Sequence, residues 1–281
     1  MRWLLPLVLL LASCGGGTPP PPPPGDPALQ RSERTARLAF SQRQLEEAAR
    51  FYRDALDKAY ARDDIAAIGD NGFSLAVVEL RRARAKESLE VIRRIEQELT
   101  RRGRGIPVDL NLVAAMAQYR SGDADAALAT AEALARGGGE VGARAQFLRG
   151  AIAADRRDAE AVAAAMAALG AASGPELRAD REELSGRRAL LLGDRGAAKQ
   201  ALVAAADLRR EGLDYSGMAR ALAYAGEASE GQEAGAYYLR AGRSAVLIGH
   251  AHDARRWLGE AKRLGDAAIV AEAEQWLARI K

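Results

Sequence analysis

Small and apolar side chains recur through most of this chain at spacings of four and then three residues. Six such trios begin 40, 39, 35, 36 and 36 residues apart. They are Ala48, Tyr52, Ala55; Ser88, Ile92, Ile95; Ala127, Ala131, Leu134; Val162, Met166, Leu169; Ala198, Leu202, Ala205; and Ala234, Tyr238, Ala241. Spacings of four and three place each trio on one face of a helix, so the pattern predicts a repeated amphipathic helix.

A second helix precedes each trio. The residue twelve positions before each trio is small in five of six cases, as a close crossing of two helices requires. These residues are Ala36, Ala76, Ala115, Gly150, Gly186 and Leu222. Turn residues lie between the two helices, as in Gly122-Asp123 and Gly193-Asp194. The repeating unit is therefore predicted to be a pair of helices.

The predicted helix pairs cover residues 29–61, 63–102, 108–136, 140–170, 176–210 and 212–248, followed by helices at 251–264 and 266–280. The last segment carries Ile269, Ala273 and Trp276 at helical spacing and is expected to cap the open end of the stack. The pairing of the helices near the C-terminus has an alternative. Gly242 with Ala254, Leu258 and Ala261 also fits the repeat, which would make 230–264 a unit.

Composition agrees with an all-α fold. The chain has ten prolines, and only Pro107 and Pro175 lie beyond residue 27. Pro175 follows Ser173-Gly174, where proline at a first helical position is favoured. The only cysteine is Cys14, so disulfides cannot hold the folded part together. Stability must come from packing between helices.

The recurring helix pairs resemble the tetratricopeptide repeat (TPR) family, whose units of about 34 residues stack into a superhelix. The resemblance covers residues 29–281. It implies a right-handed α-solenoid of six to seven TPR-like pairs with a C-terminal capping helix. The family's early aromatic residue and closing proline are mostly missing, and the first units are over-long. A generic helical bundle with alanine-rich faces is the alternative.

The N-terminus predicts export. Arg2 precedes an apolar run from Trp3 to Leu11 that is too short to span a bilayer. Leu11-Ala12-Ser13-Cys14 resembles the lipobox of bacterial lipoproteins, which implies cleavage before Cys14 and a diacylglycerol on its thiol. The alternative is an ordinary secretory signal with an incidental cysteine. The resemblance divides the chain into a signal peptide (1–13), a lipidated tether (14–28) and the helical domain (29–281).

The tether contains six consecutive prolines, from Pro19 to Pro24. Polyproline II rises about 3.1 Å per residue, so this run would hold the domain roughly 19 Å from the lipid. A proline-rich ligand for another protein is the alternative. Gly15 stands where aspartate would favour the inner membrane, so the expected location is the outer membrane, facing the periplasm.

Catalytic signatures are missing from the sequence. It contains no His-Glu-x-x-His, Gly-x-Ser-x-Gly or Gly-x4-Gly-Lys motif. His250, His252 and Asp253 lie in a predicted turn, where a solvated turn is favoured over a metal site. A net charge of +3 and export both argue against nucleic acid as a partner. We therefore predict a non-enzyme without metal or cofactor.

Nine Lys or Arg residues and four Glu residues lie between Arg81 and Arg104. This stretch could contact anionic headgroups or an acidic partner, or form a charged outer helix face. In the family, first helices of successive units line a concave groove that binds proteins. Carried over by position, the groove candidates are Phe73, Arg81, Tyr119, Arg120, Phe147 and Arg187. The aromatic candidates could instead fill the interior between helices.

The functional hypothesis is a lipid-anchored adaptor that binds envelope proteins in its groove, in outer-membrane, secretion or export assemblies. Two alternatives remain open. One is a module that binds peptidoglycan or another small ligand, and the other is an enzyme with an unrecognised carboxylate site.

Overall fold

The computed structural model describes residues 25–170 and 174–280, which form fourteen helices and no strand. The helices are α1 (Pro27–Ser41), α2 (Leu45–Ala61), α3 (Ile65–Arg81), α4 (Ala85–Arg101), α5 (Val108–Ser121), α6 (Ala124–Ala135), α7 (Gly139–Asp155), α8 (Ala159–Leu169), α9 (Pro175–Leu191), α10 (Arg195–Glu211), α11 (Tyr215–Glu227), α12 (Gly231–Leu247), α13 (Ala251–Leu264) and α14 (Ala267–Leu277). Leu11, Ala12, Ser13 and Cys14 lie outside the described residues, so the lipobox remains a prediction.

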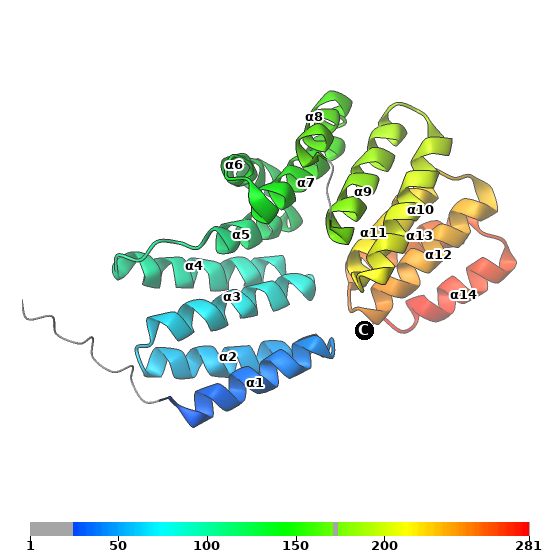
Figure 1. Cartoon of the computed structure of the whole chain (residues 1–281). Helices are drawn as coiled ribbons and strands as arrows, with labels where there is room; N and C mark the ends of the chain where they lie inside the picture. The colour runs from blue at the N-terminus through cyan, green and yellow to red at the C-terminus, as the bar shows by residue number, and fades with distance from the viewer. Residues whose placement is uncertain (1–24, 171–173, 281) are drawn as a thin grey trace, which may run out of the picture.

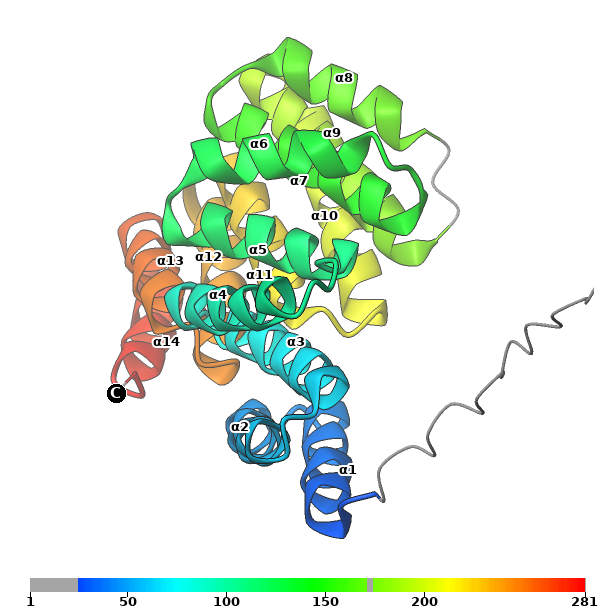
Figure 2. The same cartoon turned by 90° about the vertical axis from the view of Figure 1, so that its left-hand side faces the viewer.

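Helices adjacent in sequence pack side by side along the whole array, and α3, α5, α7 and α9 also contact one another in succession. Figure 1 shows α1–α4 on one side, α9–α14 on the other, and α5–α8 connecting them. Figure 2 shows the same stack curving from α1 and α2 to α8 and α9. The fold is an α-solenoid of stacked helix pairs, as the sequence pattern predicts.

The trio positions form the interfaces between paired helices. Ile92 and Ile95 are 1% exposed and Leu202 is fully buried. The small residues on the partner helices allow the close crossing. A Cβ atom at Gly150 would lie 2.6 Å from Leu184 Cδ1, and one at Gly186 would lie 2.4 Å from Leu202 Cγ. A side chain larger than hydrogen at either position would therefore force Leu184 of α9 or Leu202 of α10 to shift.

One turn geometry recurs between the helices. In several three-residue turns the middle residue has a positive φ, as at Arg43, Asp63 and Leu213. The third residue donates its N–H to a carbonyl five positions earlier, for example Asp214 to Arg209 at 2.7 Å. This hydrogen bond satisfies the end of one helix while the chain reverses direction. An aspartate in the third position also caps the next helix, as Asp64 does for α3.

At the C-terminal end, α14 packs on both α12 and α13. Gly242 of α12 faces Leu258 of α13, where a Cβ would lie 2.5 Å from Leu258 Cγ. Because α12 packs on both α11 and α13, both registers describe helices that are in contact at this end. Ala273 of α14 is fully buried, and α14 caps the stack.

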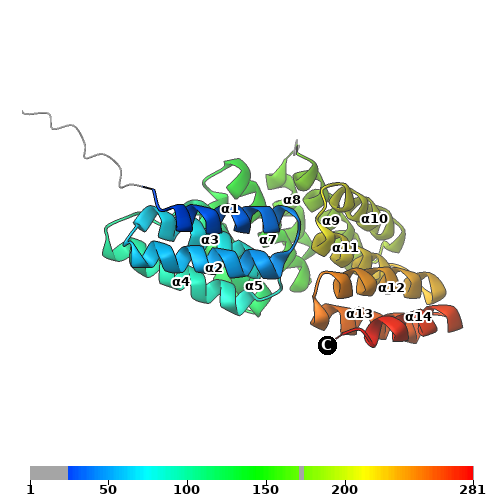
Figure 3. The same ribbon diagram turned by 90° about the horizontal axis from the view of Figure 1, so that it is seen from below.

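The two ends of the array also meet. His250, at the start of α13, places its Nε2 2.9 Å from the carbonyl oxygen of Arg81 at the end of α3. The guanidinium of Arg43 lies 4.8 Å from the centre of the Tyr215 ring. Figure 3 shows the N-terminal helices and α11–α13 side by side. The expectation of a solvated turn is therefore wrong for His250, which is 6% exposed, whereas the side chain of His252 is 93% exposed.

Among the described residues, no helix is long and apolar enough to cross a membrane. That part of the chain also contains no group of three or more His, Cys, Asp or Glu side chains arranged to hold a metal ion.

Candidate functional site

Charged side chains from four helices, together with two tyrosines, converge on the inner face of the solenoid. We call this set the inner charge cluster. It consists of Tyr119 (α5), Asp155 (α7), Asp180, Glu183 and Arg187 (α9), Arg209 (α10), Asp214 at the start of α11, and Arg220 and Tyr224 (α11). The three α9 residues are spaced by three and four positions, which puts them on one side of that helix. The cluster exists because α9 turns a charged face inward.

Glu183 lies at the centre of the cluster and is fully buried. Arg220 donates from Nε to Glu183 Oε1 at 2.8 Å and from Nη2 to Oε2 at 3.0 Å. Arg209 Nη2 donates to Oε2 at 2.8 Å. Burial alone would raise the pKa of Glu183, but the Arg220 and Arg209 guanidiniums outweigh it and lower that pKa to about 2. Glu183 is therefore an anion at neutral pH that joins α9, α10 and α11.

Arg209 connects the cluster to two more carboxylates. Its Nη2 lies 2.7 Å from Asp180 Oδ1, and its Nη1 lies 2.8 Å from Asp214 Oδ2. Its guanidinium carbon is 5.5 Å from the centre of the Phe147 ring. Among the described residues, Asp180 Oδ2 and Arg209 Nε are buried without a hydrogen-bond partner. Burial raises the pKa of Asp180 even though Arg209 opposes the shift.

Asp155 connects α5, α7 and α9. Its carboxylate accepts hydrogen bonds from Arg187 and from the Tyr119 hydroxyl. The Arg187 guanidinium also lies 4.7 Å from the centre of the Tyr224 ring. Burial raises the pKa of Tyr119 well above its usual range, so the hydroxyl stays protonated and donates. These contacts fix the orientation of the aromatic rings on the inner face.

Arg81 and Arg120 lie beside the cluster and are exposed. Neither forms an ion pair with a carboxylate in the part of the chain that the structure describes. Arg120 Nη1 donates to the Leu80 carbonyl at 3.0 Å, and Arg81 lies 4.9 Å from the centre of the Phe40 ring. Burial by the surrounding protein, and to a smaller extent the charge of Arg220, lowers the pKa of Arg120 to about 10. The side chain is nonetheless exposed to solvent. Both groups remain cationic at neutral pH.

The structure brings most of the predicted groove residues together. Tyr119 and Arg187 belong to the cluster, Phe147 lies under Arg209, and Arg81 and Arg120 lie at its edge. Phe147 is half-buried and packs against the core of α8 and α9, which fits the interior-filling alternative.

Phe73 lies elsewhere. It lines a separate cavity of about 570 Å³ between α3, α4, the loop 102–107 and the start of α5, which we call the α3–α5 cleft. The cleft lies toward the N-terminal ends of α3 and α5, whereas Arg81 and Arg120 lie near their C-terminal ends. The six candidates therefore divide between two surfaces.

The sequence did not single out Asp180, Glu183, Arg209, Arg220 or Tyr224. Apart from the contact of Arg209 with Asp214, five positions away, their ion-pair partners are 26 to 37 residues away along the chain, so local spacing does not reveal the pairing. One signal was available. Asp180, Glu183 and Arg187 share a face of α9 with Ala179 and Leu184, where apolar residues are expected.

No family model matches this chain, and no curated protein matches it. Among solved structures, a tetratricopeptide repeat protein from Parabacteroides merdae is 14% identical, with a TM-score of 0.48 over 90% of this chain and 98% of that one. The TPR2AB domain of yeast Sti1, solved in a complex with pHSP90, is 15% identical, with a TM-score of 0.38 over the same shares. The α-solenoid assignment rests on the helix pairing of this chain itself.

Proposed function

We propose that this protein is a lipid-anchored scaffold of the bacterial cell envelope that binds partner proteins on its inner face. The observation that carries the proposal is the pair Arg81 and Arg120. These two exposed cations have no carboxylate partner among the described residues, and they adjoin a rigid, internally paired charge cluster.

The partner segment is acidic. The carboxylates of the inner charge cluster are each held by arginine or tyrosine, so they are not available to bind a basic segment. Arg81 and Arg120 can instead form charge-assisted hydrogen bonds with an incoming carboxylate. The cluster holds α5, α9 and α11 in place, which lowers the entropy cost of binding.

The envelope location rests on the N-terminal sequence. The apolar run and the lipobox at Leu11-Ala12-Ser13-Cys14 support export and acylation of Cys14, and Gly15 favours the outer membrane. A single acyl chain gives only marginal membrane binding, so stable anchoring needs the two or three chains of a mature lipoprotein.

A catalytic role is not favoured by the geometry. Glu183 is fully buried and held as an anion by two arginines, which leaves it neither accessible to a substrate nor able to donate a proton. Asp180, whose pKa is raised, is only 1% exposed. The carboxylates therefore serve to organise the inner face.

The test compares two neutralising double variants that remove the same charge. Arg81→Gln with Arg120→Gln alters the inner face, and Lys86→Gln with Arg178→Gln alters two exposed cations elsewhere. The intact lipoprotein is crosslinked mildly in cells, purified from detergent-solubilised envelope, and its partners are identified by mass spectrometry. We expect a stoichiometric partner to be lost only from the inner-face variant. Equal recovery from both variants, or no partner with wild type, would contradict the proposal.

The anchor is tested separately. Cells fed radiolabelled palmitate should incorporate the label into the wild-type protein, and Cys14→Ser should abolish the labelling and release the chain from the membrane fraction. Labelling that persists in Cys14→Ser would overturn the lipobox assignment.

A further inference from the structure

The α3–α5 cleft lies beside an inter-helix loop that is longer than the turns around it. The turns on either side of α3 have three residues, whereas the segment between α4 and α5 runs from Arg102 to Pro107. This longer loop separates the N-terminal ends of α3 and α5 and leaves a cavity of about 570 Å³. Its floor is apolar and includes Phe73, Ile95 and Leu110, the last two only 1% exposed. A Cβ added at Gly69 would meet no atom within 4 Å, so the space extends to the α3 backbone.

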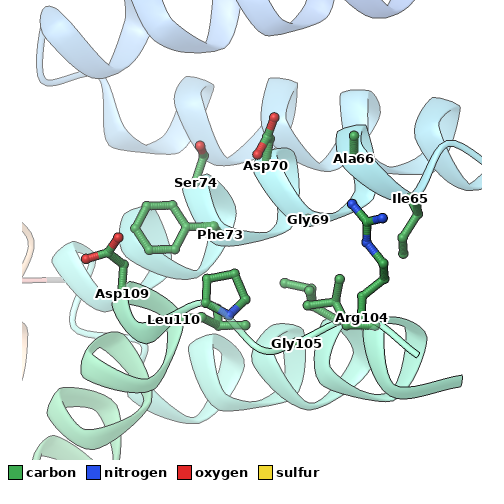
Figure 4. A pocket seen from close by; sticks show the side chains of 13 residues that line it. Ile65, Ala66, Gly69, Asp70, Phe73, Ser74, Arg104, Gly105, Asp109 and Leu110 are labelled. Carbon is green, nitrogen blue, oxygen red and sulfur yellow. The ribbon is translucent and has the colours of Figure 1, made fainter. Parts of the chain in front are cut away.

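Charged groups line the rim of this apolar floor. Figure 4 shows Phe73 and Asp109 at one end of the cavity, Arg104 at the other, and Asp70 along the α3 side. Asp70, Asp109 and Arg104 are exposed, and no ion pair or hydrogen bond involves their side chains within the described ranges. Asp63, by contrast, is paired with Arg102. The two carboxylates at the rim are therefore available to pair with an incoming cation beside the apolar floor.

Two further apolar side chains lie on the adjoining loop and helix start. Ile106 is 37% exposed and Val108 is 58% exposed, and both belong to the small set of large apolar residues in the described chain that face solvent. Exposed apolar surface beside a cavity is typical of a binding site. The apolar floor and the two carboxylates together define what would fit.

We propose that the α3–α5 cleft binds an extended segment of a partner protein with a large apolar side chain followed by lysine or arginine. The apolar side chain fills the space beside Phe73 and Gly69. The basic residue lies over Asp70 and Asp109. This segment has the opposite charge to the one proposed for the inner face, so the scaffold would hold two chemically distinct segments at opposite ends of α3 and α5.

The probe is a fluorescein-labelled peptide, Ser-Gly-Trp-Lys-Lys-Gly-Ser, titrated with the full-length protein in detergent and followed by fluorescence anisotropy. Its control replaces both lysines with glutamate. We expect the basic peptide to bind and the acidic one to bind at least tenfold more weakly. Asp70→Asn with Asp109→Asn should weaken binding of the basic peptide about tenfold, whereas Asp57→Asn, at another exposed aspartate, should not.

Gly69→Leu tests the cavity itself. The leucine side chain would enter the open space on α3, and leucine favours a helix more than glycine does, so the variant should fold. The matched control is Gly259→Leu on α13, where an added Cβ also meets no atom within 4 Å. We expect Gly69→Leu to abolish peptide binding and Gly259→Leu to leave it unchanged.

Other occupants would give different results. A concentration-dependent dimer that Gly69→Leu converts to a monomer would show that a second copy fills the cleft. Peptide binding only after removal of residues 15–24 would assign the cleft to the chain's own tether. Either result, or equal binding of the basic and acidic peptides, would overturn the proposal. None of these outcomes depends on Arg81, Arg120 or Cys14, so failure here is separable from failure of the proposed function.

Discussion

Two buried glutamates, Glu79 and Glu183, use the same device in different surroundings. Each is at most 1% exposed, and each accepts hydrogen bonds from two arginines. Glu79 is held by Arg53 at 2.8 Å and by Arg82 at 2.9 and 3.0 Å. The Arg53 side chain is 53% exposed, so solvent completes its hydration. This arrangement is a local joint between α2 and the end of α3.

Glu183 is part of a larger assembly. Its partner Arg209 is 7% exposed and contacts three carboxylates. Arg187, one turn further along α9, contacts Asp155, which also accepts from Tyr119 on α5. Two buried atoms in this assembly, Asp180 Oδ2 and Arg209 Nε, have no hydrogen-bond partner among the described residues. Buried ion pairs can therefore form either a local joint, as at Glu79, or a network that spans several helices, as at Glu183.

The strongest way to break this comparison is Glu183→Gln. The amide would turn a donor toward the buried guanidinium of Arg209 and the partly exposed one of Arg220. Breaking a buried ion pair costs about 3–5 kcal/mol. Urea unfolding should show this loss, while Glu132→Gln, at an exposed glutamate, should change stability by less than about 0.5 kcal/mol. A loss of under about 1 kcal/mol for Glu183→Gln would mean that the cluster does not hold the helices together.

Glu79→Gln should cost less, about 1–3 kcal/mol, because water can hydrate Arg53 and because Arg82 keeps its contact with Glu46. The same urea measurement applies. If Glu79→Gln proves as damaging as Glu183→Gln, the two sites are equivalent joints and the distinction drawn between them fails.

The pH dependence sharpens the comparison further. The pKa of Glu183 is lowered from 4.5 to about 2 in the folded chain, so its contribution is complete above about pH 4.5 and is lost as pH falls toward 2. Asp180 acts in the opposite sense, because its pKa is raised. We expect the difference in unfolding free energy between wild type and Glu183→Gln to shrink by on the order of 1 kcal/mol between pH 5 and pH 3. Parallel pH profiles for the two proteins would refute this assignment.

The smallest effect on stability is expected for Arg81→Gln with Arg120→Gln. Both side chains are exposed, and neither is paired with a carboxylate among the described residues. The free energy of unfolding, measured by thermal unfolding, should therefore change by no more than about 0.5 kcal/mol. Loss of partner binding with unchanged stability would separate the accessible charges from the joint beneath them. A large loss of stability would instead make these arginines structural.

The helices could be predicted from the sequence because their determinants are local. Spacings of three and four, small residues at crossings and turn residues all lie within one unit. The predicted pair at 176–210, for example, corresponds to α9 and α10 at 175–191 and 195–211. Pairing of this kind needs no knowledge of distant contacts.

The candidate surfaces could be predicted only in part. Position in the repeat placed Tyr119, Arg120 and Arg187 on the inner face, but Glu183 looked like one of many solvated helix charges. Its partners Arg209 and Arg220 are on other helices, and the packing of α9 on α10 and of α10 on α11 brings them together. The α3–α5 cleft depends on the length of one loop, so the sequence pointed to Phe73 without showing what surrounds it.

The contact between His250 and Arg81 has a consequence for the order in which the molecule is built. Most helix contacts join neighbours in sequence, so each pair can fold soon after it is synthesised. The bond between Nε2 of His250 and the Arg81 carbonyl joins residues 169 positions apart and can form only when α13 is present. The surroundings of Arg81 are therefore completed late. A nascent chain that ends before α13 would already have most of its helix pairs but not the finished inner face.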